Sequence, residues 1–235
     1  MCRQHPWYLL VVTVARDPAG RVAAPGDLTE STGPATKGER TRLRLLALAI
    51  ERFGERGYRA TSVSEIARAA GLTQAAAYAY FPSKAALFDA AVEADAAALV
   101  DTAKGRTTGV PVGQLVPMLI VCLLAELEHQ PLTGRVVGGH EPDALQRLIN
   151  LPALGRLTDD IADAVRRAQA RGEVRDDVDA DLFASGAETI IVSLVMSVTQ
   201  VGASTESRRQ LGVLSIFDAV LRPPAGGNDH TRSEC

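Results

Sequence analysis

The side chains best suited to specific chemistry are Gln74, Ala75 and Ala76, at the start of a short predicted helix. The carboxamide of Gln74 can donate one hydrogen bond and accept another, which suits the N6 and N7 edge of adenine. The methyl groups of Ala75 and Ala76 suit contact with the methyl group of thymine. This trio predicts contact with base edges rather than bond-making chemistry.

Other kinds of site lack the residues that they need. The sequence has no paired nucleophile and base, no glycine-rich phosphate loop and no metal-ligand set. His140 and Glu141 are followed by a proline, which excludes the HExxH zinc helix. Cys2, Cys122 and Cys235 are far apart, which excludes a disulfide framework or a zinc module and fits a reducing cytosol. We therefore expect no enzyme, no cofactor and no metal.

Three predicted helices position Gln74. The first spans 39–56, because Leu45, Ala49 and Phe53 repeat at helical spacing, and Gly57 stops it. Arginines occupy its other faces.

A capping box of Ser62 and Glu65 begins the second helix, which ends near residue 70. Gly71 supplies the left-handed backbone of a sharp turn. Thr73 then caps the third helix, 74–80, and Ser83 caps a long helix that reaches about residue 104. Two short helices joined by a tight turn after a supporting helix make a helix-turn-helix.

From Thr41 to Leu87 the sequence resembles the N-terminal domain of TetR-type transcriptional regulators. The matching residues agree in order and spacing: Thr41-Arg42, Phe53-x-x-x-Gly57-Tyr58, Thr61-Ser62-Val63-x-x-Ile66-Ala67-x-x-Ala70-Gly71-Leu72-Thr73, and Tyr78-x-Tyr80-Phe81-x-Ser83-Lys84-x-x-Leu87. The stretch covers about a fifth of the chain, and many spaced positions are more specific than one motif. Ala75, Ala77 and Ala85 depart from the family pattern, and Ala77 should loosen the packing beneath the recognition helix.

The resemblance implies an all-α fold, with an N-terminal three-helix DNA-binding domain and a larger C-terminal domain for effector binding and dimerisation. It implies a cytoplasmic regulator, a repressor, that binds a palindromic operator as a dimer and is released by a small molecule. The expected DNA-binding residues are Arg42, Thr61, Ser62, Thr73, Gln74, Ala75, Ala76, Tyr78, Tyr80 and Lys84.

Roles differ among these residues. Tyr80 and Lys84 are expected to contact phosphates, which set register, while Gln74 and its neighbours carry sequence specificity. Tyr78 has an alternative role as a core aromatic.

The charge distribution is consistent with this prediction. Residues 37–84 hold nine basic and four acidic side chains, whereas the whole chain has a net charge of −3. A basic module on an acidic body is typical of a protein that meets phosphates with one end only.

The second unit is predicted to be helical, with a helix over 114–130 interrupted by Pro117 and ended by Pro131. Thr158 is expected to cap a helix to Arg171, and a last helix over 205–221 should bury Leu211, Leu214, Ile216, Phe217 and Val220. The resemblance implies a homodimer through helices of about 157–171 and 182–201. The expected effector pocket comprises Met118, Val121, Cys122, Ala125 and Phe183, although ordinary core packing is an equal alternative for each. Cys122 should be unreactive, because burial raises a thiol pKa and its charged neighbour at helical spacing is Glu126.

The predicted organisation has four parts. Residues 1–36 form a disordered extension, 37–84 the DNA-binding domain with its linking helix to about 104, 105–222 the effector and dimerisation domain, and 223–235 a disordered tail. The apolar run 7–15 is interpreted as part of that extension rather than a secretory signal. The apolar stretch 190–198 has a membrane alternative, but we expect it to pack against a second copy, with no membrane partner.

Two other function classes remain open at this stage. One is a helical ligand-binding or scaffold protein that has lost DNA binding. The other is a helical enzyme, which the missing catalytic residues disfavour.

Overall fold

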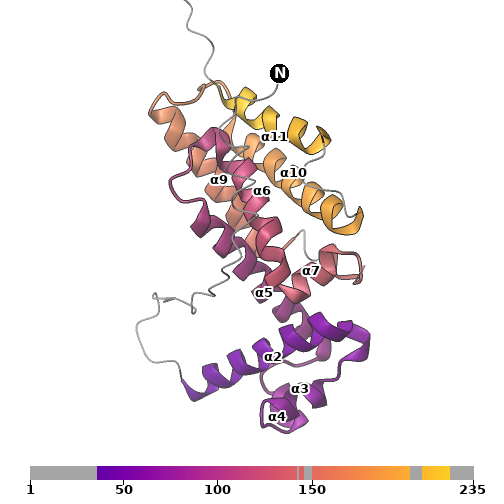
Figure 1. Cartoon of the computed structure of the whole chain (residues 1–235). Helices are drawn as coiled ribbons and strands as arrows, with labels where there is room; N and C mark the ends of the chain where they lie inside the picture. The colour runs from indigo at the N-terminus through magenta and orange to yellow at the C-terminus, as the bar shows by residue number, and fades with distance from the viewer. Residues whose placement is uncertain (1–35, 142, 146–149, 202–207, 223–235) are drawn as a thin grey trace, which may run out of the picture.

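The computed structural model describes residues 36–141, 143–145, 150–201 and 208–222, and these contain helices but no strand. A head made of the first three helices lies at one end of a helical body (Figure 1). The elements in chain order are α2 (Lys37–Ala60), α3 (Val63–Ala69), α4 (Gln74–Tyr78), α5 (Lys84–Arg106), α6 (Val112–Glu126), a 3₁₀ turn (Leu127–His129), α7 (Pro131–Val137), α9 (Pro152–Ala170), α10 (Ala180–Val201) and α11 (Arg208–Leu221).

Helix α2 buries the apolar face predicted for it, with Leu45, Ala49 and Phe53 fully enclosed. It begins two residues earlier than predicted, because Thr36 and Glu39 form a capping box. Gly57 breaks the helix as expected, with a φ of 81° that favours glycine.

The helix-turn-helix is confirmed. Ser62 and Glu65 form the predicted capping box of α3, and Gly71 adopts a φ of 74° in the turn. Helix α4 is shorter than the predicted span to Tyr80, since it ends at Tyr78. The amide of Tyr80 donates to the carbonyl of Ala77 at 3.0 Å, a three-residue spacing that tightens the chain before Phe81, which is buried.

Helix α5 connects the head to the body without interruption (Figure 1). Ser83 caps it as predicted, because its hydroxyl oxygen accepts a hydrogen bond from the backbone amide of Ala86 at 3.0 Å. It continues past its predicted end near residue 104 to Arg106, and residues 107–111 connect it to α6.

Two prolines behave differently from the prediction. Helix α6 continues through Pro117, because a proline removes one backbone donor while the bonds on either side persist. Pro131 occupies the first turn of α7 rather than ending the preceding helix, a position where its missing N–H costs nothing.

The start of α9 was wrongly predicted at Thr158. The helix begins at Pro152, whose ring suits a first helical position. The Thr158 hydroxyl lies inside the helix, 3.0 Å from the carbonyl oxygen of Leu154 and 2.7 Å from Glu188 of α10. It therefore helps to join α9 to α10, which pack closely along their lengths (Figure 1).

The last two helices leave apolar side chains exposed. Leu182 and Val201 of α10 are 74% and 77% exposed. Phe217 of α11 is buried as predicted, but Ile216 and Val220 are exposed, since they lie on the face of α11 that points away from the body. The side chains of Leu211 and Leu214 lie outside the described residues.

Two segments, Val112–His129 and Ala180–Val201, are long and apolar enough to cross a membrane by length and composition. In the apolar 18-residue window of each segment, the share that is buried within the fold is 44% for the first and 22% for the second. Core helices of water-exposed proteins share this composition, so it is weak support for a membrane span. Few residues of α10 are therefore fully buried by the described part of the chain.

Candidate nucleic-acid interface

The helix-turn-helix forms the outer tip of the head, with α3 and α4 at the end remote from α11 (Figure 1). Helix α3 packs on α4, and α2 packs on α3, so the pair is held from behind. Ala77, which is 2% exposed, lies beneath α4 and allows a close approach to α3. The outer face of α4 is thereby left free.

Gln74 and Ala75 are exposed on that outer face, and Ala76 is half-buried. Tyr78 is 39% exposed, which excludes the alternative of a buried core aromatic. The Gln74 amide nitrogen lies 3.5 Å from the Tyr78 hydroxyl, one helical turn away. The two polar groups therefore form one edge of α4.

Three hydroxyls predicted to bind DNA are engaged in holding the fold. Ser62 and Thr73 are the N-caps of α3 and α4, and each hydroxyl accepts a hydrogen bond from a backbone amide at 3.2 Å. Thr61 is 2% exposed, and its hydroxyl donates to the carbonyls of Gly57 and Arg52. A DNA contact from Thr61 would therefore have to use its main chain.

Two cations of the predicted site lie over aromatic rings. The Lys84 ammonium is 4.5 Å from the centre of the Tyr58 ring, and the Arg42 guanidinium is 4.8 Å from that of Phe81. Such contacts hold a cation in place without neutralising its charge. Tyr80 is half-buried between α4 and α5.

The head also carries cations that are not among the expected DNA-binding residues. Arg52 and Arg56 pair with glutamates, but Arg44 and Arg68 are exposed and have no ion pair among the described residues. The arginine-rich pattern of the first helix could have indicated Arg44. These charges add to the positive charge of the head.

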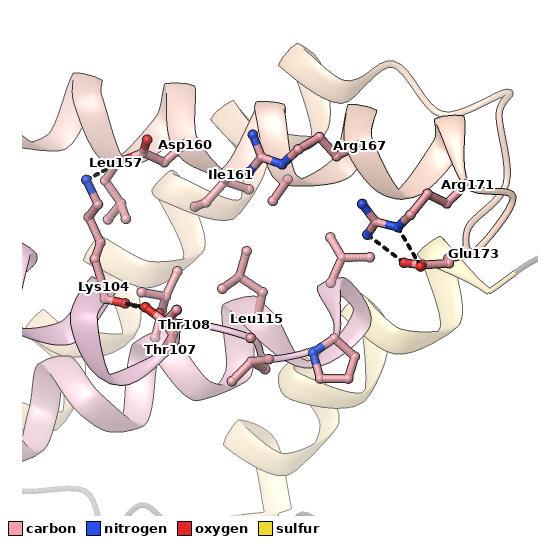
Figure 2. Close-up of a pocket in the computed structure, with 16 residues that line it drawn as sticks. Lys104, Thr107, Thr108, Leu115, Leu157, Asp160, Ile161, Arg167, Arg171 and Glu173 are labelled. Atoms are coloured by element: carbon pink, nitrogen blue, oxygen red, sulfur yellow. Dashed lines mark hydrogen bonds and ion pairs between the residues drawn. The ribbon is translucent and has the colours of Figure 1, made fainter.

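The residues of the predicted effector pocket lie within the body. Met118, Val121, Ala125 and Phe183 are half-buried, and Phe183 packs edge-on against Phe217 with ring centres 5.9 Å apart. A cavity of about 710 Å³ lies elsewhere, between the end of α5, the start of α6 and the face of α9 that is turned toward them (Figure 2). None of the five predicted residues lines it.

Cys122 is buried, and burial raises the pKa of its thiol. Glu126 raises that pKa further, whereas Arg106 lowers it. Arg106 comes from α5 and forms an ion pair with Glu126 at 2.5 Å, a long-range neighbour that helical spacing could not reveal. The net direction agrees with an unreactive thiol.

Residues 45–91 match the family model described as "Bacterial regulatory proteins, tetR family". Over 53 residues, 23% of this chain, the sequence is 47% identical to "Uncharacterized HTH-type transcriptional regulator YdgC" of Bacillus subtilis (strain 168). That match spans 27% of the length of the Bacillus protein.

Solved structures extend the likeness to the helical body. Salmonella enterica GusR aligns with a TM-score of 0.59 at 22% identity, over 80% of this chain and 99% of that chain. A protein described as a TetR-family transcriptional regulator from Rhodococcus sp. aligns with a TM-score of 0.57 at 21% identity, over 77% and 98%. At these identities the likeness concerns the fold.

Proposed function

We propose that the chain, whose residues 45–91 match the tetR family of bacterial regulatory proteins, is a regulator of that family and represses transcription by inserting α4 into the major groove of double-stranded DNA. The observation that carries this proposal is the exposed edge of α4, with Gln74 and Tyr78 outward. The same head carries Arg42 and Lys84, which lie over aromatic rings and have no ion pair within the described part of the chain. Base edges would be read by Gln74, Ala75 and Ala76, and phosphates would be held by Lys84, Arg42 and Tyr80.

The operator is proposed to be palindromic, because the protein would bind as a homodimer through α9 and α10. Support comes from the exposed face of α10, where Gly186, Ser193 and Ser197 are small enough to admit a second helix. Leu182 and Val201 at its two ends would be covered by the partner. Two heads related by a two-fold axis read two half-sites.

A small-molecule effector is proposed to release the protein from DNA by changing the spacing of the two heads. By linkage, DNA would then weaken effector binding to the same extent. The proposed location is the cytoplasm, because the exposed apolar surface of α10 would contact a second copy rather than lipid.

The test is selection of bound duplexes from a random pool by the full chain, followed by a mobility-shift titration of the recovered sequence at several salt concentrations. We expect a palindrome whose affinity falls steeply as salt rises. Double substitution of Gln74→Ala and Lys84→Ala should abolish the shift. Failure to recover any sequence at low salt would favour the alternative, a ligand-binding or scaffold protein without DNA binding.

A further inference from the structure

The cavity in the body joins an apolar floor to cationic side chains (Figure 2). Leu115 of α6 and Ala164 of α9 are half-buried and form the accessible floor. Leu119, Leu157 and Ile161 also line the cavity and are nearly inaccessible to solvent. An apolar surface in a concave site favours the hydrocarbon part of a ligand.

Charges at the two ends of the cavity are already paired. Lys104 of α5 and Asp160 of α9 form an ion pair at one end. At the other end the Arg171 guanidinium binds both carboxylate oxygens of Glu173, at 2.6 and 2.8 Å. These pairs leave little attraction for a ligand charge of either sign.

Arg167 is the exception. It lies on the cavity wall between the two pairs, one turn of α9 from Ala164, and it has no ion pair or hydrogen-bond partner among the described residues (Figure 2). The adjacent Arg166 lies outside the cavity and is bound by Asp163 and Asp181. One face of α9 therefore presents to the cavity a guanidinium with no ion pair among the described residues, one helical turn from the apolar side chain of Ala164.

We propose that this cavity binds an amphipathic organic anion, with its carboxylate on Arg167 and its hydrocarbon chain on Leu115 and Ala164. A guanidinium can hold a carboxylate through two parallel hydrogen bonds, and the floor selects against small inorganic anions. The volume of about 710 Å³ falls in the range of sites for small organic ligands.

The regulatory meaning of this site rests on the function proposed above. A ligand between α9 and the end of α5 would bear on the Lys104–Asp160 ion pair, which joins the two helices across the cavity. Helix α5 carries Lys84 at its other end, so displacement at Lys104 reaches the head through one continuous helix.

The experiment is isothermal titration of the purified full chain, without DNA, with sodium decanoate as the probe. We expect saturable binding of decanoate, binding of 1-decanol weaker by roughly tenfold, and no binding of decyltrimethylammonium. Arg167→Gln should weaken decanoate binding by about tenfold, Arg167→Lys by less, and Ala164→Phe should block it by filling the floor. Arg166→Gln is the matched control and should bind as the parent does.

Equal affinities of the Arg167→Gln and Arg166→Gln proteins for decanoate, or no binding by the parent chain, would overturn the proposal. Because Arg167 is exposed, its replacement does not threaten folding. The DNA selection is a separate measurement: decanoate binding that depends on Arg167 in a chain without DNA affinity would leave this site standing and remove the proposed regulation. Selective DNA binding without decanoate binding would do the reverse.

Discussion

The carboxylate of Glu141 accepts a hydrogen bond from the backbone amide of Tyr58 at 3.0 Å, which joins the end of α2 to the segment after α7. The same oxygen accepts from the Arg135 guanidinium at 2.9 Å. The amide of Tyr58 is free for this bond because Gly57, with its φ of 81°, interrupts the helical ladder one residue earlier. A glycine that the sequence marks only as a helix stop thus also fastens the head to the body.

Gly57→Ala is therefore expected to destabilise the protein. A Cβ at this position would overlap the ends of the Glu141 and Arg135 side chains, and moving them aside would break the hydrogen bonds that Glu141 accepts from the Tyr58 amide and from Arg135. Gly71→Ala is the matched control, since Gly71 has a similar φ of 74° but nothing within 4 Å of the added Cβ. Urea unfolding should show that the free energy of unfolding falls by about 1 kcal/mol for Gly71→Ala and by about 2–4 kcal/mol for Gly57→Ala. Equal losses would mean that the contact with Glu141 is of no energetic consequence.

Gln74→Ala and Lys84→Ala are expected to weaken DNA binding in different ways. Removing Lys84 deletes a phosphate contact, so affinity should fall for all duplexes alike and the salt dependence should become shallower. Removing Gln74 deletes a base contact, so preference at one base position should relax, by about 1–3 kcal/mol. Mobility shifts on the selected operator and on single-base variants check this. An equal loss of discrimination in both proteins would contradict the assignment.

Ser193→Arg is expected to convert the proposed dimer into a monomer. Ser193 is exposed on α10, so arginine there is harmless to a single chain but would bury a charge between two copies. Ala98→Arg, on an exposed position of α5, is the control. Sedimentation should show a dimer for the parent and the control, and a monomer for Ser193→Arg. A Ser193→Arg dimer of unchanged stability would place the interface elsewhere.

Asp95→Asn is expected to change how stability depends on pH. Asp95 is 2% exposed, and burial raises its pKa above the ordinary 3.8. The hydrogen bond that its carboxylate accepts from the Thr133 amide at 2.7 Å opposes this rise. A raised carboxyl pKa means that the folded state binds the proton more tightly than the unfolded state. The contribution of Asp95 to stability therefore declines as the pH rises from 3.8 through the folded-state pKa.

Asparagine keeps the acceptor for Thr133 without titrating. Urea unfolding of both proteins from acidic to neutral pH should show the parent losing stability relative to Asp95→Asn across that window. Parallel pH profiles would show that burial does not govern this carboxyl.

Much of the head could be predicted from sequence because its signals are local. The capping box of Ser62 and Glu65 is recognised from a spacing of three residues. Gly71 marks the turn because a positive φ favours glycine. The body was less predictable because its features are long-range. Thr158 has the composition of a cap, but its hydroxyl contacts Glu188, thirty residues away.

The site shows the same division. Gln74 could be placed on an exposed face because α4 follows directly from the turn. The inward hydroxyl of Thr61 depends on how Gly57 and Arg52 come together, which no spacing rule gives. The cavity depends on three helices meeting, so Arg167 carries no signal in the sequence beyond its charge.

One apolar cluster runs from Leu45 in α2 to Phe217 in α11, and Gly54 of α2 is close enough to α7 that a Cβ there would lie 2.8 Å from Pro131. The head consequently cannot be exchanged between relatives as an independent domain with a boundary at the start of α5. In a chimaera that takes only residues 36–83 from a relative, Pro131 and Leu132 would pack against a non-native α2. A chimaera that also takes α7 from that relative keeps a matched α2–α7 contact. Engineering a new operator preference into this scaffold should therefore proceed by replacing the outer residues of α4, not by transplanting the tip.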